Sequence, residues 1–173
     1  MRPKNIISLV LIALLAAGLT GCFKSETALI GAAEADYPFQ TITYVRAGED
    51  DKITLERVGD RYVSPLEKDK AWLRLKALGN NLFVAQIADV NDGVPFHLYG
   101  FIKLAPDKTS FDVIKGVADP KDRMAAEDGK ADFSVCPVDK SHVCLGSLKG
   151  FIDYAMKATG TGRVEHFNIL AFK

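Results

Sequence analysis

The chain of 173 residues carries 22 basic and 22 acidic side chains, so its formal net charge at pH 7 is zero. Hydrophobic residues make up 48% and charged residues 25% of the sequence, which is typical of a folded domain and not of a disordered segment. The two signs of charge are interspersed, and this excludes the basic stripe that marks a nucleic-acid-binding surface or a lipid-surface contact.

The chain begins with a leader that has a basic start and an apolar body. Met1-Arg2-Pro3-Lys4 precedes residues 6–19, which are apolar with two exceptions, and the run ends in Leu19-Thr20-Gly21-Cys22. A membrane-spanning helix needs about 20 apolar residues. This run is shorter and polar residues follow it, so a cleaved leader is the better interpretation.

The leader resembles the signal peptide of bacterial lipoproteins, in which an aliphatic residue and two small residues precede a cysteine. The resemblance implies that Cys22 becomes the first residue of the mature protein and carries a diacylglycerol and an amide-linked fatty acid such as palmitate. Three acyl chains anchor a protein to a membrane without any other membrane element. In enterobacterial lipoproteins an Asp at the place of Phe23 signals retention in the inner membrane. The resemblance therefore implies a lipid-anchored envelope protein in the outer membrane, facing the periplasm.

Cleavage before Cys22 would leave 152 residues with 20 basic and 22 acidic side chains, a net charge of −2. This length favours one domain with a core of its own. We expect a signal peptide over residues 1–21, a lipidated N-terminus and tether over 22–36, and a single globular domain over 37–173. The tether assignment rests on the small and polar residues that dominate that segment.

From residue 40 onward the sequence is a succession of short strands and turns. The expected strands are rich in β-branched and aromatic residues or alternate in polarity, and Gly-Asp and Gly-Asn-Asn separate two pairs of them. This even spacing predicts a mainly β fold of the α+β kind, an antiparallel meander that forms a small barrel or a sandwich. The expected strands are 41–45, 53–58, 61–63, 71–78, 82–90, 96–104, 111–114 and 164–171.

The last third of the chain contains two expected helices. Asp119-Pro120 is a start signal for a short polar helix that ends near Gly129. Ser147 is a cap for a second helix, whose apolar residues recur at spacings of three and four. We expect the apolar stripe of this C-terminal helix to pack over the sheet or across a barrel mouth. Its members are Leu148, Phe151, Ile152, Ala155 and Met156.

Two cysteines remain once Cys22 is assigned to the lipid. In an oxidising periplasm Cys136 and Cys144 most simply form a disulfide. Closing so small a loop would remove about 2 to 3 kcal/mol of chain entropy from the unfolded state. The alternative is a zinc site of Cys136, His142 and Cys144, but it lacks a fourth ligand and the short Cys-x-x-Cys spacing. We therefore expect no metal and no cofactor.

Catalytic motifs are missing from the sequence. His97, His142 and His166 are scattered and do not form a pair at metal-ligand spacing. There is no Gly-x-Ser-x-Gly elbow, no Ser-x-x-Lys and no phosphate-binding glycine loop. We assign no catalytic residue and expect that the protein is not an enzyme.

The strand over residues 96–104 has aromatic residues on its outer face. If Phe96, Leu98 and Ile102 fill the core, Tyr99 and Phe101 lie outside, beside Trp72 of a neighbouring strand. Exposed aromatics on a sheet face favour a docking surface. The alternative is that the C-terminal helix covers them.

Three functions remain open. The first is a lipid-anchored binding or accessory module that contacts an envelope protein, attached to the membrane through Cys22. The second is a carrier of a small apolar ligand, in which the barrel holds the molecule in the manner of lipocalins. The third is an envelope hydrolase in which one of the histidines approaches a Ser, Asp or Glu. The carrier requires a cavity lined by side chains such as Leu73, Leu75, Phe96 and Ile102.

Overall fold

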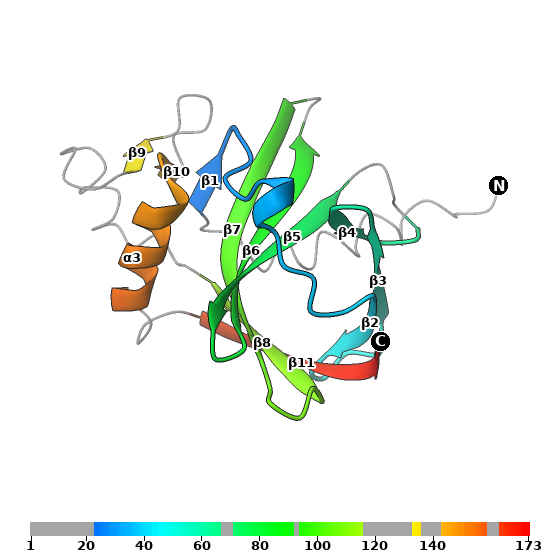
Figure 1. The fold of residues 1–173 in the computed structure, drawn as a ribbon. Coiled ribbons are helices and arrows are strands. Elements are labelled where there is room, and N and C mark those ends of the chain that lie inside the picture. Colours follow the sequence, from blue (N-terminus) through cyan, green and yellow to red (C-terminus); the bar gives the residue numbers. More distant parts are fainter. Residues whose placement is uncertain (1–22, 67–70, 92–93, 116–132, 136–142, 159–162) are drawn as a thin grey trace.

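The computed structural model describes residues 23–66, 71–91, 94–115, 133–135, 143–158 and 163–173. Within them, eight strands form a closed antiparallel barrel and one short helix lies beside it (Figure 1). The expected mainly β fold is confirmed, and of the two architectures it is the barrel. The barrel strands are β2 (Thr41–Arg46), β3 (Lys52–Val58), β4 (Arg61–Val63), β5 (Trp72–Gly79), β6 (Leu82–Asn91), β7 (Val94–Leu104), β8 (Ser110–Lys115) and β11 (Arg163–Phe172).

The strands follow one another around the barrel as a meander. Each strand from β2 to β8 pairs with the next, and β11 closes the barrel by pairing with both β8 and β2. The turn residues explain the tight hairpins: Gly59 has a φ of +63°, and Asn80 and Asn81 have φ values of 51° and 57°. Glycine and asparagine adopt this left-handed conformation at low cost.

A small side sheet branches from β7. The first half of β7 pairs with β1 (Phe23–Ser25), whereas its second half pairs with β8. On its other edge β1 pairs in parallel with β10 (Val143–Leu145), which pairs with β9 (Phe133–Val135). The sequence patterns did not predict any of these three short strands.

The expected tether is wrong for residues 23–36, because this segment belongs to the folded domain. Phe23 and Ile30 have no exposed surface. After the 3-10 helix η1 (Ala32–Glu34), the backbone N–H of Asp36 donates to the carbonyl of Leu75 over 2.7 Å. Figure 1 shows the segment leading from β1 past η1 to the start of β2. Small and polar residues suggested a spacer, but contacts with the barrel hold the segment in place.

Helix α3 (Leu148–Ala158) packs on the outside of the barrel, next to the side sheet (Figure 1). The hydroxyl of Ser147 accepts a hydrogen bond from the backbone of Gly150 over 3.0 Å, as expected for a cap. Phe151 is wholly buried and stacks on Phe101, with ring centroids 5.1 Å apart. The C-terminal helix is therefore confirmed. The helix expected over 120–129 lies outside the described residues.

The apolar residues form two cores. One fills the barrel interior and includes Ile42, Tyr44, Leu73 and Phe111. The other lies between the outer face of the barrel, β1 and α3, and it is centred on Phe151. Because side chains alternate along a strand, β7 contributes to both cores.

Candidate functional site

The barrel interior contains an apolar cavity that is open at its mouth. Leu73, Leu75 and Ile102 line it, as expected from the sequence. Phe96 is not among its lining residues and packs instead against the edge of the same core. None of the described residues that line the cavity carries a charge. The cavity therefore suits an apolar and uncharged occupant.

One end of the cavity is closed by the residues just before β2. Pro38 and Phe39 line the cavity. The Phe39 ring stacks on Tyr62 at a centroid distance of 4.2 Å and meets the edge of Phe172, the last residue of β11, at 5.7 Å. The Tyr62 hydroxyl donates to the Phe39 carbonyl over 2.8 Å. The N-terminal segment thus contributes to the wall of the cavity.

A second, smaller hollow lies next to the first. Leu55, Leu73 and Ile87 line both. The second is also lined by Val63, where β4 ends, and Trp72, where β5 begins. The hollow space therefore continues from the Phe39 end toward the other end of the barrel.

Of the described residues that line the main cavity, Tyr44 is the one with a polar side-chain atom. It is 1% exposed, and its hydroxyl has no hydrogen-bond partner within the described part of the chain. Burial raises the pKa of this phenol above its ordinary value, so the group stays protonated and keeps an O–H to donate.

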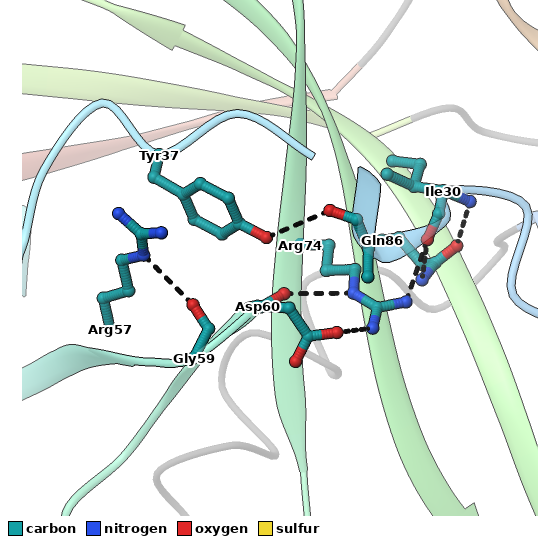
Figure 2. A network of polar contacts seen from close by, with 8 residues as sticks. Ile30, Tyr37, Arg57, Gly59, Asp60, Arg74 and Gln86 are labelled. Atoms are coloured by element: carbon teal, nitrogen blue, oxygen red, sulfur yellow. Dashed lines mark hydrogen bonds and ion pairs between the residues drawn. The ribbon is translucent and has the colours of Figure 1, made fainter. Parts of the chain in front are cut away.

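A polar network on the outside of the barrel fastens the N-terminal segment (Figure 2). The Gln86 side chain accepts from the backbone of Ile30 over 2.7 Å and from the Tyr99 hydroxyl over 2.9 Å. Arg74 donates to the Ile30 carbonyl over 3.0 Å and forms an ion pair with Asp60. The guanidinium of Arg74 also lowers the pKa of the Asp60 carboxyl below its usual range.

The outer aromatic residues of β7 are covered. Phe151 of α3 lies against Phe101 and also against Tyr99, with centroids 6.0 Å apart in the second pair. Tyr99 is 0% and Phe101 is 2% exposed. Of the two interpretations of this face, coverage by the C-terminal helix is therefore correct, and the docking surface is not formed by these rings.

The described histidines lie on different strands and do not line the cavity. His97 on β7 is 8% exposed and contacts the edge of Trp72. Burial lowers the pKa of its imidazole, and the nearby charge of Arg74 acts in the same direction. His166 is exposed and its Nδ1 lies 2.7 Å from Asp112 across the β11–β8 pair. Both side chains are exposed to solvent, so the pair is an ordinary surface contact and not a sign of a site.

The residues predicted for lipidation and cross-linking are mostly not described. Cys22, Cys136 and His142 lie outside the described residues, while Cys144 is on β10 and is 9% exposed. Within the described ranges, no three His, Cys, Asp or Glu side chains are grouped so that they could hold a metal ion.

No protein-family model matches the chain, and comparison with curated proteins and with solved structures finds no significant match. Among the helices in the described part of the chain, none has the length and apolar character needed to cross a membrane. The fold and the cavity are therefore the observations from which a function is argued.

Sequence reasoning found three of the cavity residues but missed its polar atom. Alternation in β5 and β7 placed Leu73, Leu75 and Ile102 inside the barrel. The same alternation in β2 would have placed Tyr44 there with Ile42, since both are buried in the barrel core. The sequence does not show that the Tyr44 hydroxyl has no hydrogen-bond partner among the residues that the structure describes.

Proposed function

We propose that the protein is a lipid-anchored protein of the bacterial envelope whose barrel binds one small, largely apolar molecule. The observation that carries this proposal is the uncharged cavity inside the barrel. An eight-stranded barrel has an interior just wide enough to be filled by side chains or to hold one small ligand. Its lining is apolar, as the lining of small-molecule pockets predominantly is.

The anchoring part of the proposal rests on the leader. Leu19-Thr20-Gly21-Cys22 supports acylation of Cys22, which would attach the chain to the outer membrane on its periplasmic side. The near-neutral charge gives no reason to propose a nucleic-acid partner.

Ligand binding is better supported than the two other functions. The aromatic face that would have favoured a docking module is covered by α3. A hydrolase would need a histidine and a nucleophile in a cleft. His97 and His166 lie outside the cavity, and the proposal is therefore one of binding, not of catalysis.

A fluorescence titration tests the proposal. The chain from residue 22 to 173 with Cys22→Ser, exported through a different leader, carries every described residue without the lipid. Titrated into N-phenylnaphthylamine, an uncharged dye that fluoresces in apolar surroundings, it should give a saturable signal with one site per chain. A chain that leaves the dye fluorescence unchanged would contradict the proposal.

A matched pair of variants locates the dye. Ala85 is 4% exposed and lines the cavity, so Ala85→Phe should fill part of the space. We expect its affinity for the dye to fall by at least about 10-fold, a loss of about 1.4 kcal/mol. Ala171 is exposed on β11, and Ala171→Phe adds the same ring outside the cavity. Equal affinities of the two variants would place the dye elsewhere. Circular dichroism checks that both variants remain folded, since overpacking a core is destabilising.

A further inference from the structure

Three tyrosines in the described residues are wholly or almost wholly buried, and two of them have a hydrogen-bonded hydroxyl. The Tyr62 hydroxyl donates to the Phe39 carbonyl over 2.8 Å. The Tyr99 hydroxyl donates to Gln86 and accepts from the backbone of Leu29, both over 2.9 Å. The Tyr44 hydroxyl has no such partner among the described residues. Tyr44 therefore differs from the other two in a way that its burial does not explain.

Tyr44 lies in the wall of the cavity. The residue lies in the middle of β2, between Ile53 of β3 and Ile169 of β11. Its ring meets Phe111 and Phe167 in edge-to-face contacts at 5.0 Å and 5.7 Å, so apolar rings occupy its sides. Tyr44 itself lines the cavity. The Tyr44 side chain therefore borders the cavity, while its hydroxyl is itself buried.

An unpartnered buried hydroxyl is costly, and a phenylalanine would fill the same space without that cost. Native interiors satisfy nearly all of their buried polar groups, so an exception calls for an explanation, and a bound molecule is one. Water is one such molecule, but a water in a cavity needs two to four polar partners. Among the described residues that line this cavity, Tyr44 is the side chain that offers one.

We propose that the ligand is an uncharged molecule with an apolar body and one hydrogen-bond-accepting oxygen, such as a ketone or ester, which accepts from the Tyr44 hydroxyl. This inference rests on the proposed function and names the chemical class of the ligand. The phenol supplies the donor. A carboxylate is disfavoured because the described residues of the lining include no cation to pair with it.

The test compares two ligands of the same size that differ in the oxygen. Methyl octyl ketone and undecane have the same number of heavy atoms, and each is titrated against the chain loaded with N-phenylnaphthylamine. We expect the ketone to displace the dye at about 10-fold lower concentration than undecane, from one hydrogen bond in an apolar site. Decanoate at neutral pH should displace the dye less well than the ketone.

Two variants show whether Tyr44 is the donor. Tyr44→Phe removes the hydroxyl alone and should abolish the preference for the ketone while undecane binds as before. Tyr62→Phe removes a bonded hydroxyl at the cavity end and should retain the preference. This control separates a loss of hydrogen bonding to the ligand from a general change in the core.

The outcomes separate this inference from the proposed function. If the unsubstituted chain binds the ketone and undecane equally well, or if Tyr44→Phe keeps the preference, the inference is wrong and the carrier function stands. If neither the dye nor undecane binds, the proposed function fails and the inference fails with it. The comparison of ketone with undecane in the unsubstituted chain does not depend on any variant folding.

Discussion

The rings of Phe101 and Phe151 lie almost parallel, with an angle of 17° between their planes and 5.1 Å between their centroids. This contact joins the outer face of the barrel to helix α3. Phe151 also packs against Phe23, at 5.2 Å, and so links the helix to β1. One side chain therefore holds together three elements that are far apart in the sequence.

Replacing Phe151 by alanine should destabilise the protein strongly. The ring is 0% exposed, and its removal leaves a cavity among three elements. We expect the free energy of unfolding to fall by about 3–5 kcal/mol, measured by urea denaturation. Asp153→Ala changes an exposed residue of the same helix and should leave the unfolding midpoint almost unchanged. Similar losses in both variants would show that a general disturbance of the helix, and not the loss of the buried ring, is responsible.

Replacing Gln86 by leucine should loosen the N-terminal segment. Gln86 is wholly buried and bonds to the backbone of Ile30 and to Tyr99. Leucine would leave these donors unsatisfied, at a cost of about 1–3 kcal/mol. Amide hydrogen exchange at Ile30 should become at least about 10-fold faster. Gln40→Leu makes the same change at an exposed position and should not affect exchange at Ile30.

The stability of the protein should fall as the pH drops below about 6.5, in part because of His97. Burial lowers the pKa of this imidazole in the folded state below its value of 6.5 in the unfolded chain. The unfolded state therefore takes up the proton first, and stability that is present above pH 6.5 is lost as the pH falls through the lower, folded-state pKa.

Urea unfolding midpoints at a pH of about 7.5 and about 5 measure this effect. The His97→Gln variant should lose less stability between these pH values than the unsubstituted protein does. His166→Gln makes the same substitution at an exposed histidine and serves as the matched control. An unchanged pH dependence in His97→Gln would assign the effect to other groups.

Mass spectrometry of the protein purified from its own membranes tests the predictions for the cysteines. We expect a chain that begins at acylated Cys22 and, after proteolysis without reductant, a peptide that joins Cys136 to Cys144. Reduction should then lower the free energy of unfolding by about 2–3 kcal/mol. An unmodified Cys22 on an uncleaved chain would refute the lipoprotein interpretation, and free thiols at 136 and 144 would restore the metal alternative.

The barrel strands could be predicted because their signal is local. In β5 and β7 the alternation of side chains indicates which residues face the core. Residues 59–60 and 79–81 indicate where the chain turns. These patterns do not depend on which distant part of the chain covers the sheet. They were enough to predict a meander and the inward direction of Leu73, Leu75 and Ile102.

The side sheet and the fastening of the N-terminal segment could not be predicted in the same way. β1 has three residues, and it is held by Tyr99 of β7 and Val143 of β10, which are distant in the sequence. A segment of small and polar residues has no period of its own. The segment is held in place by partners such as Gln86. That this side chain is a buried hydrogen-bond acceptor is visible only in the folded structure.

The early start of β1 has a consequence for how the protein would stand on a membrane. A free tether over residues 23–36 would let the domain reach about 45–50 Å from the lipid surface. Instead, Phe23 is buried in the side sheet and directly follows Cys22, so an acyl group on that cysteine would be one residue away from the barrel wall. Such an anchor would keep the barrel close to the membrane surface, where a free tether would let it move away.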